Sequence, residues 1–370
     1  MRVAVVAESF LPHLNGVTGS VLRVLDHLSA RGHPAMVVAA GHRAPISYRG
    51  TPVVHVPSMG VPGYPQVRIS VATAHRLTEL LGAFAPDVVH LASPLLLGNT
   101  ATKAASTLDV PTVAVFQTDV AAFAERYGFP GWSMRIWNRT QEIHGAAART
   151  LAPSAHAEQA LHERGVPRVH RWARGVDVER FRPRTCTVGR FAAPGRVVVG
   201  FHGRLAPEKQ LEDLAVLDAL PAVQLVLVGD GPSRTKLRAL LPGAIFTGSL
   251  TGDDLADAVA SFDVMVHPGE SETFCQSVQE ALACGVPVIA PAAGGVQELV
   301  VPSRTGWLYA PGDVAGLRAA VLDLVGDGAK RRAFGAAARQ AVRGRSWEVL
   351  GDQLIAHYRH AIHEHSGIRR

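Results

Sequence analysis

The chain has 370 residues, of which 47% are apolar and 18% are charged, and its formal net charge is +6. This composition excludes a disordered chain, and the length suits two globular domains with substantial cores. No apolar run approaches the roughly 18 to 20 residues that cross a bilayer, so no membrane-spanning helix is expected.

Basic residues are more frequent in the first half of the chain. Residues 1–180 hold 17 Lys and Arg against 12 Asp and Glu, whereas residues 181–370 hold 20 against 19. A basic half can indicate contact with an anionic membrane or with nucleic acid. Because 33 of the 37 basic residues are Arg, compositional bias explains the excess equally well. No nucleic-acid partner is expected.

The N-terminus and the cysteines favour a cytoplasmic protein. The apolar run Val3–Ala7 ends at Glu8 and is too short for the core of a secretory signal. Cys186, Cys275 and Cys284 form neither a disulfide framework nor a metal-ligand spacing. We therefore expect no bound metal, and we expect Cys284 to be a small buried side chain.

Short apolar runs alternate with helical patterns up to about residue 180. This alternation predicts a mainly parallel sheet with helices on both faces. Strands are expected at 3–7, 35–39, 53–56, 88–91, 112–116 and 150–152, and helices include 17–30, 71–84 and 155–164.

The same alternation begins again after the turn-rich segment 181–195. Strands are expected there at 197–201, 224–228, 244–246, 264–266 and 288–290, and an amphipathic helix at 347–363. We predict two doubly wound, Rossmann-like α/β domains over 1–180 and 196–345, with the ligand cleft between them. The C-terminal segment 346–370 is expected to pack back towards the first domain.

Two glutamates, Glu272 and Glu280, lie between the apolar runs 264–267 and 286–290. The helical spacing between these runs, and Gly285 as a stop, place Glu272 at or just before a helix N-terminus and Glu280 about two turns inside. Such an N-terminus attracts a phosphate, and the two carboxylates suit the hydroxyls of a sugar and a ribose. Taken alone, the pair is explained more simply by a first-turn glutamate and a solvated one.

A loop with two cations follows the first strand of the second domain. Gly203 and Arg204 leave strand 197–201, and Lys209 stands five residues after Arg204. The planar fork of Arg can bind phosphate oxygens, and Lys adds a point charge. Lys209 could instead pair with a carboxylate on its own helix. Together with the helix end near Glu272, a diphosphate clamp is the better interpretation.

Three further strand ends carry weaker signals. Gly16 stands in a strand-to-helix turn that matches neither a Walker loop nor a dinucleotide fingerprint. Gln117 and Asp119 follow strand 112–116, where a carboxylate could face the cleft or cap a helix. Leu250 follows another strand, in a loop that is more simply an ordinary turn.

Together these motifs resemble the retaining glycosyltransferases of family 4, which have the two-domain GT-B fold. The resemblance rests on Glu272-x7-Glu280 followed by Ala-Leu-Ala-Cys-Gly-Val-Pro-Val, and on Gly-Arg204-Leu-Ala-Pro-Glu-Lys209 before it. It covers nearly the whole chain.

Two first-domain segments narrow the resemblance. Both look most like segments of actinobacterial GDP-mannose-dependent α-mannosyltransferases. They are Val-Ala-Glu-Ser-Phe-Leu-Pro-His-Leu-Asn-Gly16-Val and Phe-Gln117-Thr-Asp119-Val-Ala. Those enzymes mannosylate glycolipids such as phosphatidylinositol mannosides or glucuronosyl diacylglycerol.

The resemblance implies a catalytic role for five residues. Arg204 and Lys209 would neutralise the donor diphosphate, and Glu272 would bind the donor sugar. Gln117 and Asp119 would approach that sugar from the acceptor side. Glu280 would bind the ribose. The other donor-binding positions are Gly16, Gly203, Leu250, Phe274, Cys275, Gln276 and Ser277.

Two positions depart from the family pattern. Many relatives have His in place of Gln117 and Gly in place of Cys275. If the backbone at Cys275 needs a positive φ, the side chain there is strained.

The implied reaction is transfer of a hexose, most simply mannose from GDP-mannose, to a glycolipid with retention and without a metal or other cofactor. The implied partners are the nucleotide sugar, a lipid acceptor and an anionic membrane surface, on which a cytoplasmic enzyme would act peripherally. Two alternatives remain open: a soluble UDP-sugar-dependent transferase with a small-molecule acceptor, and a sugar-nucleotide-binding protein or epimerase of the same fold. The acceptor, the linkage and the oligomeric state stay undetermined.

Overall fold

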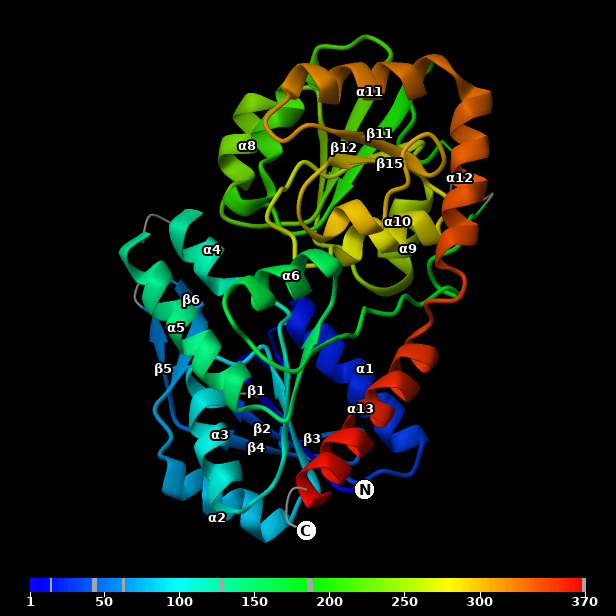
Figure 1. The fold of residues 1–370 in the computed structure, drawn as a ribbon. Helices are drawn as coiled ribbons and strands as arrows, with labels where there is room; N and C mark the ends of the chain where they lie inside the picture. Colours follow the sequence, from blue (N-terminus) through cyan, green and yellow to red (C-terminus); the bar gives the residue numbers. More distant parts are fainter. Residues whose placement is uncertain (14, 42–44, 62–63, 127–129, 185–188, 368–370) are drawn as a thin grey trace. The chain divides into compact units, whose positions relative to one another are not determined.

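The structure, a computed structural model, divides the chain into two α/β units (Figure 1). It describes residues 1–13, 15–41, 45–61, 64–126, 130–184 and 189–367. The first unit comprises Met1–Arg174 and Trp347–Arg370, and the second comprises Gly175–Ser346. The chain therefore enters the second unit shortly before the turn-rich segment 181–195.

An eight-stranded sheet forms the centre of the first unit, in the order β10-β9-β8-β7-β1-β2-β4-β3. Neighbouring strands are parallel except for the edge pair β3 and β4. The strands are β1 Val3–Ala7, β2 Ala35–Ala40, β3 Ser47–Tyr48, β4 Thr51–Val56, β7 Val88–Ala92, β8 Thr112–Val115, β9 Arg149–Ala152 and β10 Val169–Arg171, and a separate antiparallel hairpin joins β5 Ser58–Val61 to β6 Tyr64–Ser70. Every strand expected in this half is present. The additional edge strands β3 and β10 have only two or three residues, too few for a periodic pattern.

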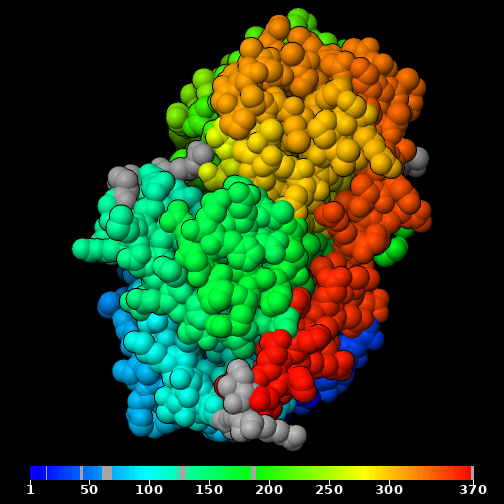
Figure 2. Space-filling model, in the orientation of Figure 1, coloured from blue at the N-terminus to red at the C-terminus, as the bar shows by residue number. Residues whose placement is uncertain are grey.

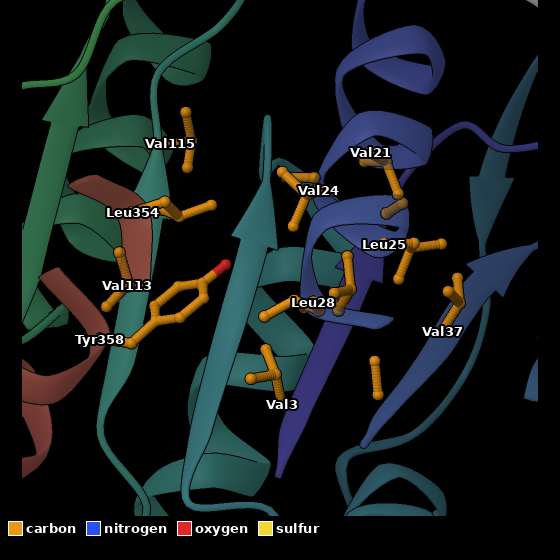
Figure 3. Packing of buried hydrophobic residues seen from close by; sticks show 14 of the residues in the cluster. Val3, Val21, Val24, Leu25, Leu28, Val37, Val113, Val115, Leu354 and Tyr358 are labelled. Atoms are coloured by element: carbon orange, nitrogen blue, oxygen red, sulfur yellow. The ribbon is translucent and has the colours of Figure 1, made fainter. Parts of the chain in front are cut away.

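Helices cover both faces of this sheet. They are α1 Gly16–Ala30, α2 Ala74–Phe84, α3 Leu96–Thr107, α4 Val120–Arg126, α5 Pro130–Ala146, α6 Ala155–Glu163 and α13 Trp347–Gly367. Strand β1 shows how the two faces are filled, because successive side chains point to opposite sides. Val3 packs with α1 and α13 (Figure 3), and Val5 belongs to the same cluster. Ala4 and Val6 pack with α2, α3 and α5 on the other face.

The C-terminal helix α13 is part of the first core. Tyr358 is fully buried, and its hydroxyl forms a 2.7 Å hydrogen bond with Nδ1 of His90. Burial lowers the pKa of His90 to about 4, so its ring is neutral at pH 7. Trp172 donates from Nε1 to the carbonyl of Leu350 at 2.8 Å. In Figure 2 the red C-terminal residues lie directly against green residues of the same unit. One such contact is between the rings of His357 and His170, whose centroids are 5.8 Å apart.

The second unit contains a six-stranded, wholly parallel sheet in the order β13-β12-β11-β14-β15-β16. Its strands are β11 Val197–His202, β12 Val223–Val228, β13 Ile245–Gly248, β14 Val264–Val266, β15 Val288–Pro291 and β16 Gly306–Tyr309. Its helices are η2 Pro207–Lys209, η3 Leu211–Leu214, α7 Ala215–Asp218, α8 Arg234–Leu240, α9 Gly252–Ala260, α10 Gln276–Ala283, η4 Gly294–Glu298, α11 Val314–Gly326 and α12 Gly328–Val342.

The strand order of the second unit contains a switch point. The chain runs from β11 outward through β12 and β13, then returns to the other side of β11 and runs outward through β14, β15 and β16. Loops that leave β11 and β14 therefore diverge and leave a crevice at their carboxyl ends, the usual place for a ligand in such sheets.

None of the described helices combines the length and apolar character needed to cross a bilayer.

Candidate functional site

The loops after β11 and β14 bring the candidate residues of the second unit together at the switch point. Arg204 and Lys209 follow β11, and Glu272 follows β14. The two strands are neighbours, paired at Val199 with Val264. Residues that are far apart along the chain therefore meet at one edge of the sheet.

Glu272 lies between two basic side chains. Its Oε1 accepts a hydrogen bond from Nζ of Lys209 and another from Nε2 of His267 at 3.0 Å. His267 is 1% exposed, and the side chains of Lys209 and Glu272 are 19% and 15% exposed. Lys209 thus pairs with a carboxylate of the neighbouring loop, not with one on its own helix.

The charged forms of His267, Glu272 and Lys209 stabilise one another. Burial opposes the charge of His267, but the nearby Cys275 and Glu272 outweigh it and raise the pKa of His267 to about 9. Burial likewise disfavours the charged forms of the other two residues. Lys209 and His267 nevertheless hold the pKa of Glu272 far below its usual range, and Glu272 holds the pKa of Lys209 above its own. All three groups are charged at neutral pH.

Helix α10 begins four residues after Glu272, in agreement with the prediction. Cys275 precedes its first residue with φ +82° and ψ +82°, so this backbone does have the positive φ that favours glycine. Sγ of Cys275 lies 3.3 Å from Oγ of Ser277. Gly285, with φ +74°, follows the end of the helix as expected. The free N–H groups of this helix start lie beside the charged cluster, where an anion is favoured.

A glycine pair holds the backbone before α10. Gly295 donates its N–H to the carbonyl of Glu272 at 2.7 Å, and a Cβ on Gly294 would lie 2.7 Å from the same oxygen. A Cβ on Gly295 would lie 2.4 Å from the carbonyl oxygen of Thr273. Only glycines allow this approach, which fixes the position of the Glu272 backbone.

Glu280 lies on α10 beside a second buried histidine. Nε2 of His202 donates to the carbonyl of Ser277 at 3.0 Å and lies 3.4 Å from Oε2 of Glu280. Burial lowers the pKa of His202 to about 4, so its ring is neutral at pH 7. The side chain of Glu280 is 16% exposed and can still meet a ligand at the crevice.

Arg204 is the most accessible cation at this site. Its side chain is 45% exposed, and Nη1 lies 3.8 Å from Oε1 of Glu208. Gly203, before it, has φ +147°, and its carbonyl oxygen would lie 1.9 Å from a Cβ on Gly229. The loops after β11 and β12 thus pack backbone against backbone next to Arg204. Leu250 is partly exposed in the loop after β13.

In the first unit, Gly16 and Gln117 are joined by a residue that the sequence analysis did not identify. Arg174 donates from Nη2 to Oε1 of Gln117 at 2.5 Å and from Nη1 to the carbonyl of Gly16 at 3.3 Å. Gly16 begins α1 after the cap residue Asn15, whose side chain accepts from the N–H of Thr18. A Cβ at Gly16 would lie 3.2 Å from Nη1 of Arg174. Arg174 therefore occupies the space that this glycine leaves.

Asp119 caps helix α4, which was the simpler of the two interpretations of this residue. Its Oδ1 accepts the N–H of Ala122 at 2.9 Å, and burial raises the pKa of Asp119 despite that hydrogen bond. A contact between Asp119 and a sugar stays a prediction.

Sequence reasoning missed His202, His267 and Arg174. The histidines had a usable signal, since each lies at the end of a strand that the site residues follow. Arg174 had no such signal, because nothing near it in the chain indicates a contact with Gln117.

The cysteines differ from the expectation in one respect. Cys284 is buried as predicted, and burial raises the pKa of its thiol well above the usual range. Cys186 lies outside the described residues. Cys275, however, joins His267 and Glu272 in a group whose ligand atoms all lie within 4.8 Å of one another. No such group was expected.

Two family models match separate parts of the chain. Residues 14–180 match the family model described as Glycosyltransferase Family 4, and residues 196–327 match the model described as Glycosyl transferases group 1.

Two curated relatives are mannosyltransferases by name. The GDP-mannose-dependent alpha-mannosyltransferase of Mycolicibacterium smegmatis is 53% identical over 97% of each chain. The GDP-mannose-dependent monoacylated alpha-(1-6)-phosphatidylinositol monomannoside mannosyltransferase of Corynebacterium glutamicum is 34% identical, over 49% of this chain and 53% of its own length.

Among solved structures, sucrose-phosphate synthase from Thermosynechococcus elongatus superposes with a TM-score of 0.80 at 20% identity, over 97% of this chain and 98% of its own. This likeness, together with the two mainly parallel sheets, confirms the predicted fold class of two Rossmann-like α/β domains.

Proposed function

This chain belongs to glycosyltransferase family 4, and we propose that it transfers mannose from GDP-mannose to a glycolipid acceptor with retention at the anomeric carbon. The strongest support within the molecule is the position of Glu272, held by Lys209 and His267 beside the start of α10. The near-full-length similarity to the M. smegmatis enzyme supports GDP-mannose as the donor.

The chemistry needs negative charge to be stabilised on the departing phosphate while positive charge develops at the anomeric carbon. The free N–H groups of α10 and the exposed guanidinium of Arg204 provide fixed positive charge for the diphosphate. Lys209 adds a second cation when its ammonium, which now binds Glu272, also contacts the donor phosphate. The remaining oxygen of Glu272 accepts hydrogen bonds from the sugar hydroxyls.

We propose that the acceptor hydroxyl attacks the anomeric carbon from the same face from which the diphosphate leaves, so that the configuration at this carbon is retained. In this scheme the departing phosphate takes the proton of the acceptor hydroxyl, so the protein supplies no general base. We propose that the reaction needs no metal, because Arg204, Lys209 and a helix N-terminus already neutralise the diphosphate. Glu280 binds the ribose hydroxyls, and Leu250 contacts the base.

The first unit is proposed to bind the acceptor. Arg174 sets the amide of Gln117, which approaches the sugar from the acceptor side.

An exposed apolar patch of the first unit suits a lipid surface. Trp132 and Met134, near the start of α5, are 57% and 74% exposed, and the guanidinium of Arg135 lies 5.6 Å from the Trp132 ring centre. Tryptophan beside arginine is typical of the boundary between lipid headgroups and acyl chains. We propose that this patch contacts the anionic membrane that carries the acceptor.

The decisive experiment is a donor comparison with purified protein in EDTA. GDP-mannose, GDP-glucose, UDP-glucose and UDP-galactose are each tested for thermal stabilisation and for acceptor-dependent transfer into an extracted lipid fraction, followed by mass spectrometry. We expect stabilisation and transfer with GDP-mannose alone. Transfer from a uridine donor to a small molecule would replace this proposal with the soluble alternative, and conversion of the donor without an acceptor would indicate an epimerase.

Two substitutions test whether transfer depends on the site around Glu272. Glu272→Gln should abolish transfer, whereas Glu348→Gln, at a 74% exposed glutamate of α13, should leave it unchanged. Equal loss in both variants would contradict the assignment of the site.

Membrane contact is tested separately by sedimentation with vesicles that contain phosphatidylinositol. Trp132→Ser with Met134→Ser should weaken sedimentation, and Val301→Ser, at a 45% exposed valine of the second unit, should not. Raising the salt concentration should also weaken it, because each Arg near the surface contributes about 1 kcal/mol. Equal sedimentation of all variants would rule out the α5 patch.

A further inference from the structure

His267, Glu272 and Cys275 place three different metal-ligand atoms in one small volume. A ring nitrogen, a carboxylate oxygen and a sulfur all lie within 4.8 Å of one another. His267 and Cys275 are 1% and 5% exposed, and the side chain of Glu272 is 15% exposed. Within the residues that the structure describes, no other group of this kind occurs.

These distances are close to those of a zinc site. Zinc bonds of about 2.0 to 2.3 Å in a tetrahedron place neighbouring ligand atoms roughly 3.3 to 3.8 Å apart. Nε2 of His267 and Oε1 of Glu272 are already 3.0 Å apart. On binding the ion, the protonated ring of His267 and the thiol of Cys275 would each release one proton to solvent. Nitrogen, oxygen and sulfur are all usual zinc ligands, and a fourth position would remain open to water or a phosphate oxygen.

Two features of this group are unusual for a purely structural cluster. Nδ1 of His267, the ring nitrogen that does not contact Glu272, is buried and has no hydrogen-bond partner in the described part of the chain. Cys275 holds a positive φ that a glycine would adopt without cost, and backbone strain of this kind concentrates at functional sites. The thiol is a ligand atom that a glycine could not provide.

Lys209 would compete with a metal ion for the carboxylate of Glu272. Its ammonium now binds the same carboxylate oxygen that a metal would use. A divalent ion on Glu272 would repel the ammonium, and the 19% exposed side chain of Lys209 has access to solvent. The ion would also occupy the space beside α10 where the proposed donor binds.

We propose that His267, Glu272 and Cys275 bind Zn²⁺ or a similar thiophilic divalent cation, and that the bound ion inhibits the enzyme by displacing Lys209 from Glu272. The binding is independent of the assigned reaction, whereas the inhibition rests on the proposed function. The site is regulatory, since the transfer itself is proposed to proceed without metal.

Binding is tested with Co²⁺, whose thiolate complexes absorb in the near ultraviolet and whose tetrahedral complexes absorb in the visible. All proteins carry Cys186→Ser, so that only Cys275 and Cys284 can contribute a thiolate. We expect both absorption bands to appear on titration with Co²⁺ and to disappear when Zn²⁺ is added. Absence of the bands in this parent protein would overturn the proposal.

Two cysteine variants make the assignment specific. Cys275→Ser should abolish the thiolate band and weaken Co²⁺ binding at least tenfold, whereas Cys284→Ser should retain both. Circular dichroism checks that each variant is folded. A thiolate band that survives Cys275→Ser in a folded protein would show that the ion binds elsewhere.

Inhibition is measured as the ratio of transfer rates with and without Zn²⁺, so that each variant serves as its own reference. We expect the parent and Cys284→Ser to be inhibited and then restored by EDTA, and Cys275→Ser to need at least ten times more Zn²⁺. Metal binding without inhibition would overturn the regulatory role. If no donor is transferred at all, the proposed function fails, while the Co²⁺ spectra still decide whether the site exists.

Discussion

Arg174 donates a hydrogen bond from Nη2 to Oε1 of Gln117 across 2.5 Å, and both side chains are more than nine-tenths buried. The second arm of the guanidinium reaches the carbonyl of Gly16. One planar cation therefore joins the start of α1 to the end of β8 through two separate nitrogens, a geometry that the single nitrogen of a lysine does not reproduce.

Arg174→Lys should lower the free energy of unfolding by about 1 to 3 kcal/mol, because the single ammonium nitrogen cannot reproduce both hydrogen bonds of the guanidinium fork and a buried oxygen is left poorly satisfied. Transfer should fall as well, since Gln117 loses its fixed orientation. Urea denaturation and initial rates measure the two effects. Arg76→Lys, at a 59% exposed side chain, is the matched control and should change neither. Unchanged stability in Arg174→Lys would show that the contact is not structurally important.

Arg204 and Glu280 should affect different kinetic constants. Arg204→Ala should reduce kcat by about 100- to 1,000-fold, as expected for loss of one charge-stabilising group, and should barely change stability because the side chain is 45% exposed. Glu280→Ala should mainly raise the KM for the donor, because its ribose contact is the same in the ground and transition states. Steady-state kinetics at varied donor concentration separate these outcomes. Near-normal turnover in Arg204→Ala would remove this residue from the mechanism.

The charge on His267 should make stability depend on pH. Its pKa is raised from an ordinary 6.5 to about 9 in the folded state, so the stabilisation is fully present below about pH 6.5 and is lost as the pH rises through 9. The full contribution is on the order of 3 kcal/mol. We expect the stability difference between the wild type and His267→Asn to shrink between pH 6.5 and pH 9.

Urea denaturation at several pH values measures this difference, and NMR of ¹⁵N-labelled histidine follows the ring directly. His33→Asn, at a partly exposed histidine of the first unit, controls for the general effect of removing a histidine. A constant difference across the range, or a His267 ring that titrates below pH 6.5, would contradict the ion pair.

Glu8 should stabilise the start of α3. One of its carboxylate oxygens accepts the N–H groups of Leu95 at 2.7 Å and Gly98 at 2.9 Å, and Leu95 lies at a helix start with no side-chain cap of its own. Glu8→Ala should cost about 1 to 3 kcal/mol in unfolding free energy, and Glu8→Gln less, because the amide keeps an acceptor oxygen. Thermal and urea denaturation provide the measurement, with Glu79→Ala, 51% exposed, as the control. Equal effects at Glu8 and Glu79 would show that this contact is dispensable.

Much of the fold follows from local sequence patterns. Alternating apolar runs and helical stretches predicted the strands at the centre of both sheets, because a buried parallel strand needs a continuous apolar segment wherever it lies. The same logic placed Arg204, Lys209 and Glu272 at strand ends, and Gly285 marked the end of α10. Short edge strands such as β3 and β10 escaped prediction, because a few exposed residues carry no period.

The sequence by itself determined the two-domain α/β fold and the strand ends at which the candidate residues stand. Only the tertiary structure decided their partners: Lys209 and Glu272 are 63 residues apart in the chain, and Gln117 and Arg174 are 57 apart. The physical reason is that such contacts depend on which strands become neighbours, as β11 and β14 do, and on their register. Strand order results from packing across the whole sheet, whereas periodicity reports only which side of each element is buried.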